Sequence, residues 1–190
     1  NSPICRRLPG IGTALAVSSP RRRASGTSMT DIHRHIAAAQ GYIELGLHAE
    51  ASAELSALPV SAHARVEVIE LNVLCLMAEK RWEDAFALAA RLCEQEPAEP
   101  GGFIHAAFCL HELGRTAEAL DFLGRGPAAL RTKPVYYYNM GCYHAKLGQM
   151  DKALRYLKQA FEMDESLRRY ARKDPDLAAL REKLQSKTTV

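Results

Sequence analysis

Four ten-residue segments of the chain align without a gap, and each begins 34 residues after the one before it. They are GLHAEASAEL from Gly46, KRWEDAFALA from Lys80, GRTAEALDFL from Gly114 and GQMDKALRYL from Gly148. Self-similarity at such a fixed period is typical of arrays in which one small unit repeats and stacks on its neighbours. The sequence therefore predicts an array of four stacked units.

Equivalent positions of the four repeats carry the same kind of side chain. Counted from Ile32, Val66, Pro100 and Pro134, position 20 is Ala51, Ala85, Ala119 and Ala153. Position 8 is Ala39, Val73, Ala107 and Gly141, small in three of the four repeats, and position 24 is apolar throughout. Two helices can cross closely only where both offer little side-chain bulk, so each repeat is expected to be a helical hairpin.

This pattern resembles the tetratricopeptide repeat, which has a small residue at position 8, Gly at 15, Ala at 20 and often Pro at 32. The resemblance covers roughly residues 32 to 164 and implies an all-α fold, a right-handed α-solenoid of stacked antiparallel helix pairs. Three departures leave local geometry open: Lys80 replaces the turn glycine, Gly126 stands at position 27 of the third repeat, and only Pro97 occupies position 32.

The chain divides into two parts at Met29. Residues 1–28 are rich in Ser, Pro, Gly and Arg and show no helical period, so we expect a disordered basic extension. It is interpreted as an organelle transit segment, a weak signal peptide, a basic tail, or a segment foreign to the native protein. Residues 29–190 are expected to form the repeat domain, with capping helices from about residue 164. Residues 164–172 are expected to extend the fourth hairpin as an amphipathic helix, and a helix then restarts at Asp174 and Pro175.

Charge and cysteine content narrow the class of protein. Of the 25 Lys and Arg residues, five lie in residues 1–28, which leaves 20 basic and 22 acidic residues in 29–190. This balance argues against nucleic-acid binding by the folded part. Apolar runs are too short for a membrane span. The five cysteines lack the spacing of a disulfide framework, which favours a cytoplasmic location, or an organelle if residues 1–28 are a transit segment.

No catalytic signature is present in the sequence. Nucleophile elbows, zinc-protease helices, phosphate-binding loops and CxxC pairs are all missing. His105 and Cys109 share one helix face, but Cys142 and His144 are two residues apart and so point in different directions. We therefore expect a protein that is not an enzyme and that has no metal or other cofactor.

The expected binding surface is the concave groove that the resemblance implies. In tetratricopeptide repeats the first helices line such a groove, chiefly with positions 2, 5, 9, 12 and 13. The candidate residues are Ile36, Gln40, Ile43, Glu67, Glu70, Leu74, Met77, Ile104, Phe108, His111, Tyr138, Cys142 and Lys146. Their apolar members predict a stripe with a rim of Glu, and large exposed apolar stripes usually bind a partner. The alternatives are that the N-terminal tail or the C-terminal cap covers the stripe, or that the chain self-associates.

These observations favour a protein-binding adaptor or co-chaperone-like module that holds a peptide in its groove. A carboxylate clamp fits badly, because it needs Lys, Arg and Asn where the groove offers Ile36, Leu74 and Phe108. Two alternatives stay open. The chain could be a self-associating scaffold, or a chaperone of the type III secretion kind, because FIHAAFCLHELGRTAEAL is similar to repeats of that class.

Overall fold

The computed structural model describes residues 29–181 and shows helices and turns without any strand in that range. The all-α prediction is confirmed, whereas the expectation for residues 1–28 lies outside the described residues. The helices are α1 (Met29–Glu44), α2 (His48–Ser56), α3 (Val66–Ala78), α4 (Trp82–Gln95), α5 (Pro100–Glu112), α6 (Thr116–Gly124), α7 (Pro134–Lys146), α8 (Met150–Met163) and α9 (Leu167–Ala171). Three short 3-10 helices are η1 (Val60–Ala62), η2 (Ala128–Thr132) and η3 (Pro175–Leu180).

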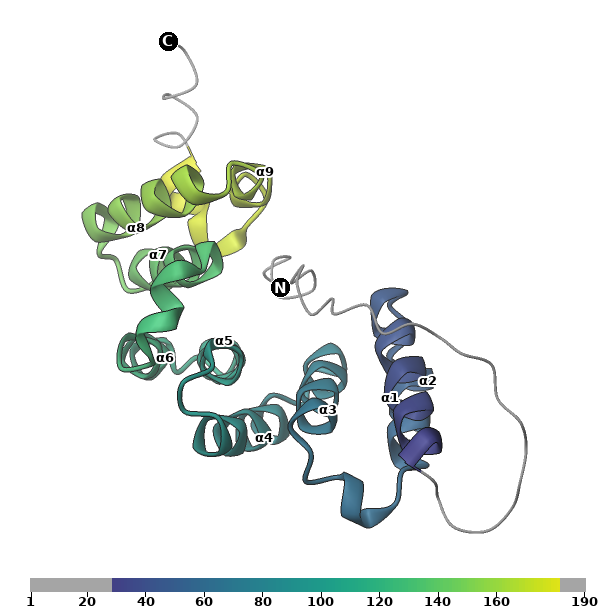
Figure 1. Cartoon of the computed structure of the whole chain (residues 1–190). Coiled ribbons are helices and arrows are strands. Elements are labelled where there is room, and N and C mark those ends of the chain that lie inside the picture. Colours follow the sequence, from purple (N-terminus) through teal and green to yellow (C-terminus); the bar gives the residue numbers. More distant parts are fainter. Residues whose placement is uncertain (1–28, 182–190) are drawn as a thin grey trace.

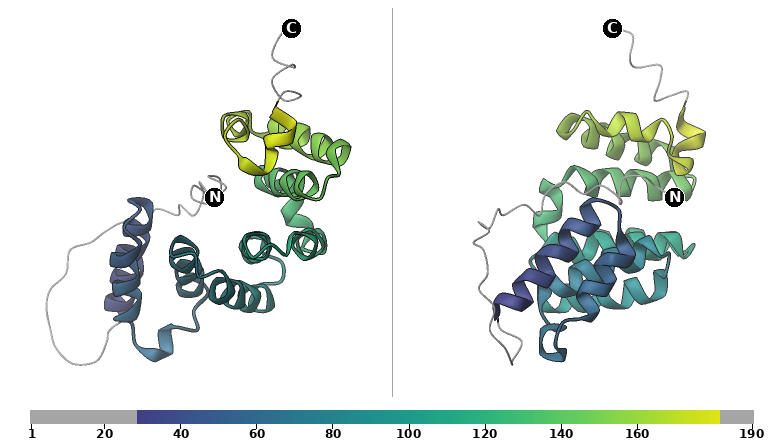
Figure 2. Two further views of the ribbon diagram at one scale, coloured as in Figure 1. Left: turned by 180° about the vertical axis from the view of Figure 1, so that it is seen from behind. Right: turned by 90° about the vertical axis from the view of Figure 1, so that its right-hand side faces the viewer.

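The helices form an arc of successive hairpins (Figures 1 and 2). Helices α3 and α5 lie on the inner side of the arc, and α4 and α6 lie on its outer side (Figure 1). The core consists of three clusters that follow one another along the chain, each packed between neighbouring helices. This is the solenoid that the 34-residue period predicts, because each hairpin buries its apolar faces against the hairpins beside it.

Each hairpin turns at a residue in the left-handed backbone region. These residues are Gly46 (φ 77°), Lys80 (φ 60°), Gly114 (φ 78°) and Gly148 (φ 74°). At the third turn, the N–H of Gly114 donates to the carbonyl of His111 at 2.9 Å, and the N–H of Arg115 donates to Leu110 at 2.9 Å. These two bonds satisfy carbonyls at the end of the first helix, as in a Schellman motif. Lys80 adopts the same geometry, so the missing glycine does not change the turn.

Replacing Lys80 with glycine is expected to stabilise the protein by about 0.5 to 1 kcal/mol, because a side chain in the left-handed region costs more than the unfolded-state entropy that glycine adds. Urea denaturation of the two proteins measures the difference. Lys80→Ala is the matched control and should change little, since alanine keeps the Cβ atom. An equal gain from both substitutions would show that the lysine side chain, and not the backbone, is responsible.

Small residues bring the two helices of each hairpin together, as predicted. The four position-20 alanines are fully buried. In the fourth hairpin, a Cβ atom added to Gly141 would lie 2.7 Å from Cγ of Leu157 and 2.9 Å from its Cδ2, which is closer than atoms can approach. In the fourth hairpin, the interface at positions 8 and 24 therefore has no room for a further carbon atom.

The connection around Gly126 departs from the regular repeat. Helix α6 ends at Gly124, and Pro127 is the N-cap of the 3-10 helix η2. A Cβ atom at Gly126 would overlap the side chain of Leu130 and approach Cδ1 of Phe103 to 3.0 Å. Glycine is therefore required here because Leu130, which is fully buried, passes directly over the backbone.

The C-terminal end corrects one expectation. The sequence predicts that residues 164–172 extend the fourth hairpin, but α8 ends at Met163 because Asp164 takes an extended conformation (φ −148°, ψ 100°). Helix α9 is a separate short helix. Asp174 caps the following helix as expected, since its Oδ1 accepts a hydrogen bond from the N–H of Asp176 at 3.0 Å, but the turns that follow are 3-10 rather than α.

Candidate partner-binding groove

The 13 predicted groove residues all lie on the first helices α1, α3, α5 and α7, and their exposure divides them into two groups. We call the first group the open half: these side chains are at least partly exposed, namely Ile36, Gln40, Ile43, Glu67, Glu70 and Leu74. We call the second group the closed half: it comprises Ile104, Phe108, His111, Tyr138 and Cys142, all buried, with the exposed Lys146 at its end. Met77, also buried, separates the two halves.

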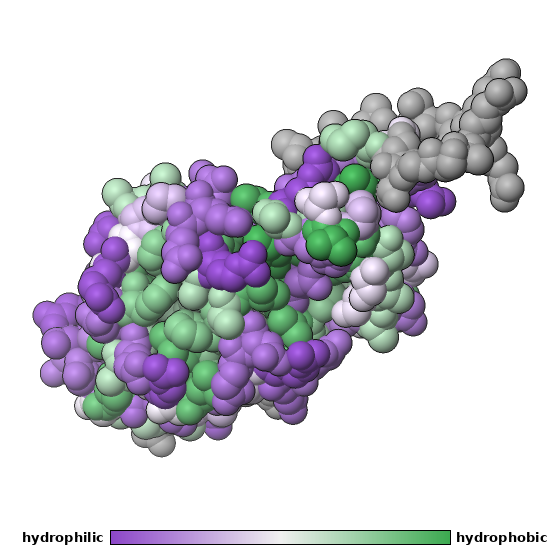
Figure 3. Space-filling model, turned by 90° about the horizontal axis from the view of Figure 1, so that it is seen from below, coloured by the Kyte–Doolittle hydropathy of each residue, from purple (hydrophilic) through white to green (hydrophobic). Residues whose placement is uncertain are grey.

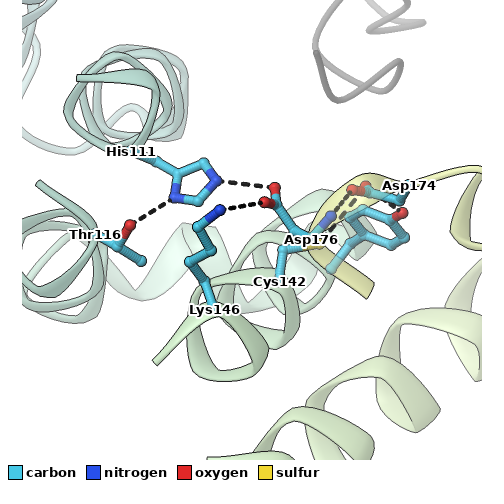
Figure 4. A network of polar contacts seen from close by, with 7 residues as sticks. His111, Thr116, Cys142, Lys146, Asp174 and Asp176 are labelled. Carbon is cyan, nitrogen blue, oxygen red and sulfur yellow. Dashed lines mark hydrogen bonds and ion pairs between the residues drawn. The ribbon is translucent and has the colours of Figure 1, made fainter. Parts of the chain in front are cut away.

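The C-terminal segment 174–180 covers the α7 part of the closed half. The hydroxyl of Tyr138 donates to Oδ2 of Asp174 at 2.8 Å, and the thiol of Cys142 points at the same oxygen at 3.8 Å (Figure 4). Burial, followed by the neighbouring Cys142 and Asp174, raises the pKa of Tyr138 well above its ordinary value. The phenol therefore stays protonated and acts as the donor to the carboxylate.

A second carboxylate of this segment joins α5 to α7. Nε2 of His111 lies 2.9 Å from Oδ2 of Asp176, Lys146 Nζ lies 3.6 Å from its Oδ1, and Nδ1 of His111 is 3.0 Å from the hydroxyl of Thr116 (Figure 4). Burial alone raises the pKa of Asp176, but the hydrogen bond from His111 and the charges of His111 and Lys146 outweigh it and lower the pKa. The carboxylate is therefore ionised at neutral pH.

Apolar residues of the segment complete this contact. Leu177 and Leu180 are buried in the same core cluster as Ile104 and Tyr138. The continuous stripe of exposed apolar residues expected over all four repeats is thus not present, because the C-terminal segment occupies the part formed by α7. This is the occlusion by the C-terminal cap that the sequence left open as an alternative.

Phe108 is buried for a different reason. Its ring packs edge-on against Trp82, with the centroids 5.9 Å apart and the planes at 82°, and both rings belong to the cluster that contains Met77. The contact joins α4 of the second repeat to α5 of the third. Phe108 therefore holds successive repeats together and does not face solvent.

The open half combines apolar side chains with acidic ones. Glu70 is half-buried on α3, and burial raises its pKa, helped by the negative charges of Glu67, Glu99 and Glu96. The carboxylate of Glu70 lies over α5, because a Cβ atom added to Gly101 would be 3.5 Å from its Oε1. We call these four residues, Glu67 and Glu70 on α3 and Glu96 and Glu99 in the loop before α5, the acidic rim. Their negative charge disfavours an anionic partner.

Sequence reasoning missed the residues that fill the closed half and those that complete the acidic rim. Asp174 was identified only as a helix cap, and Asp176 and Thr116 were assigned no role. The only local signal was the pair of carboxylates in Asp-Pro-Asp. Glu96 and Glu99 lie in a loop outside the groove positions, so position counting along the first helices does not find them.

Surface hydrophobicity is not confined to the groove. On the face seen from below, hydrophobic side chains gather in the middle and hydrophilic ones surround them (Figure 3). Val60 in η1 is 89% exposed and lies outside the groove positions. Any test of the groove therefore needs a control substitution at an exposed apolar residue elsewhere.

The described residues hold no group of three His, Cys, Asp or Glu side chains placed to bind a metal ion. Burial raises the pKa of the Cys93 thiol to about 11 and that of Cys109 to about 12, so neither is a thiolate nucleophile at neutral pH. Burial lowers the pKa of His105 to about 4. Between residues 29 and 181, no helix has both the length and the apolar content that crossing a bilayer requires.

Comparisons with known proteins agree with this architecture. Family models described as tetratricopeptide repeat match residues 76–139 and 134–167. A structure of MamA (AMB-1, crystal form P212121) is similar, with a TM-score of 0.61 and 19% identity over 75% of this chain and 84% of that chain. A second MamA structure gives a TM-score of 0.61 and 16% identity over 73% and 81% of the two chains.

A third solved structure is PcrH in complex with the chaperone binding region of PopB, with a TM-score of 0.49 and 20% identity over 68% of this chain and 97% of that chain. No curated protein matches the sequence. At these identities the two MamA structures support the fold alone, and the family models identify its repeats. The chain therefore belongs to the tetratricopeptide repeat family.

Proposed function

We propose that the protein is a non-enzymatic adaptor that holds a partner peptide in the open half of its groove, while its own C-terminal segment occupies the closed half. The observation that carries the proposal is the contrast between the two halves. In the open half, Ile36, Ile43 and Leu74 are partly exposed on neighbouring first helices. Partly exposed apolar side chains on adjacent helices are the anchors that a docked peptide uses.

The acidic rim indicates which charge the partner peptide carries. Burial raises the pKa of Glu70, and the negative charges of Glu67, Glu99 and Glu96 raise it further. A Lys or Arg side chain placed among them would relieve this repulsion, whereas an acidic side chain would increase it. We therefore expect the partner segment to be amphipathic and basic, with apolar residues against Ile43 and Leu74.

The test uses two designed peptides with the same apolar residues, one bearing Arg and the other Glu at its polar positions. The full chain should bind the Arg peptide, and the double variant Ile43→Glu, Leu74→Glu should weaken binding at least ~10-fold, because each substitution places a charge where an apolar anchor sits. Isothermal titration measures the affinities, and circular dichroism verifies that each variant is folded.

Val60→Glu is the matched control, since it makes the same change at an exposed residue outside the groove and should bind as the parent does. Equal binding of the Arg and Glu peptides, or equal binding by the groove variant and the parent, contradicts the proposal. Mass that grows with protein concentration in the parent, and not in the groove variant, would instead assign the open half to a second copy of the chain. A cytoplasmic location and a type III secretion chaperone role stay predictions.

A further inference from the structure

Outside the groove, the structure has a surface pocket of about 570 Å³ between α7 and α8. Tyr137 and His144 line it from α7, and Lys152, Arg155, Tyr156 and Gln159 line it from α8. Tyr137 and His144 are seven residues apart and share one face of α7, turned by roughly 100° from the face that carries the groove residue Tyr138. The pocket is thus separate from the groove and from the function proposed for it.

Aromatic rings form one wall of this pocket. The ring of Tyr156 lies 5.2 Å from that of His144, nearly parallel at 20°, and 6.3 Å from that of Tyr137 at 36°. Tyr137 is held in place by an edge-on contact with Tyr136 at 5.0 Å. Tyr137 and Tyr156 are only partly buried, so their rings present a fixed apolar surface on which a flat ring can lie.

Two cations also line the pocket. Lys152 and Arg155 lie one turn apart on α8, and neither forms an ion pair within residues 29–181, although Lys158 on the same helix pairs with Glu162 at 3.6 Å. Among residues 29–181, no carboxylate lines the pocket. Two cations beside each other without a counter-ion form a site for an anion, and the Arg and Lys pair suits the oxygens of a phosphate.

The positive charges of Lys152 and Arg155 act on the ring of His144. Its Nδ1 is 2.8 Å from Oε1 of Gln149, an arrangement in which the ring nitrogen donates to the amide oxygen. Burial lowers the pKa of His144, the positive charges of Lys152 and Arg155 lower it further, and the hydrogen bond to Gln149 opposes them. A bound anion would reverse the effect of the two cations on this ring.

We propose that this pocket binds a small organic phosphate, with the phosphate between Lys152 and Arg155 and a planar ring on Tyr137 and Tyr156. The volume lies within the range of pockets that hold small molecules. Charge alone would attract any anion, whereas charge beside a wall of tyrosines selects an anion attached to a ring.

The first test compares phenyl phosphate, inorganic phosphate and phenol by isothermal titration on the full chain. Phenyl phosphate should bind at least ~10-fold more tightly than either of the others, because only it uses both sides of the pocket. Adenosine monophosphate and O-phosphotyrosine then show which kind of ring is preferred. Equal affinity for phenyl phosphate and inorganic phosphate, or the absence of saturable binding, overturns the proposal.

The second test uses variants and the His144 resonance. Lys152→Gln with Arg155→Gln should weaken phenyl phosphate binding at least ~10-fold, whereas Lys158→Gln on the same helix should leave it unchanged. Saturating phenyl phosphate should raise the pKa of His144, which NMR follows. An equal loss from both variants, or a His144 titration that phenyl phosphate does not move, contradicts the assignment, and neither result bears on peptide binding in the groove.

Discussion

Replacing Asp174 with alanine is expected to lower the free energy of unfolding by about 2 to 4 kcal/mol and to expose the closed half of the groove. The carboxylate of Asp174 is fully buried. It accepts the hydroxyl of Tyr138 at 2.8 Å and the backbone N–H of Asp176 at 3.0 Å. Its removal leaves a buried phenol without this acceptor and takes away the cap of η3, so the docked segment loses one hydrogen bond to α7 and the bond that fixes its own first turn.

The thiol of Cys142 gives a local measurement of this change. Cys142 is 4% exposed and lies 3.8 Å from the carboxylate of Asp174, so a thiol reagent should reach it only when the segment lifts away. In Asp174→Ala its modification should become at least ~10-fold faster, while the buried Cys75 and Cys93 keep their rates as internal controls. Modification in the folded protein is distinguished from global unfolding by this difference between thiols.

Tyr138→Phe completes a double-mutant cycle with Asp174→Ala. If the hydrogen bond between them carries the effect, the two substitutions should be coupled by about 1 to 2 kcal/mol, since each single variant already removes the same bond. Strict additivity in urea denaturation, or unchanged reactivity of Cys142, would show that the segment is held by Leu177 and Leu180 alone.

The repeats were predictable because their determinants are local and occur four times. The alanines at position 20 mark the helix crossings, and Gly46, Gly114 and Gly148 mark the turns. Even Lys80 takes the turn geometry, because the packing of the flanking helices outweighs the cost of a left-handed lysine. A pattern that recurs at a fixed spacing fixes the hairpins without knowledge of distant contacts.

Exposure in the groove could not be predicted in the same way. Position counting places Tyr138 and Cys142 beside Ile43 and Leu74 on equivalent helix faces, yet the first two are buried and the others are partly exposed. The difference comes from residues 174–180, which lie outside the repeat period. Because this segment lies outside the repeat, it has no periodic sequence pattern, and the place where it docks is found only from the structure.

The end of α8 shows the same limit at short range. The apolar pattern continues past Met163, and the sequence therefore predicts one long helix. Asp164 instead takes an extended conformation and lets α9 turn back toward the end of the solenoid. Because the chain bends at Asp164, Asp174 and Asp176 lie against α7, where their segment covers the closed half.

His105 is expected to make the protein less stable as the pH falls below neutrality. The ring is buried on α5, its Nδ1 has no hydrogen-bond partner within residues 29–181, and burial lowers its pKa from 6.5 to about 4. The unfolded chain therefore binds a proton between these two values while the folded protein does not. Stability from this residue is complete above pH 6.5 and is lost progressively as the pH falls toward 4, by about 3 kcal/mol in all.

Urea denaturation of the parent and of His105→Leu, at several values between pH 7.5 and pH 4.5, measures this contribution. The lower limit lies above the range in which Asp176 titrates, and the shifted pKa of His144 affects both proteins equally. The parent should lose about 2 kcal/mol more than the variant over this interval, and the variant should be at least as stable at pH 7.5 because it removes an unsatisfied buried nitrogen. Parallel pH dependences would mean that His105 is protonated in the folded protein, and would require a partner for its ring within α5 or its neighbours.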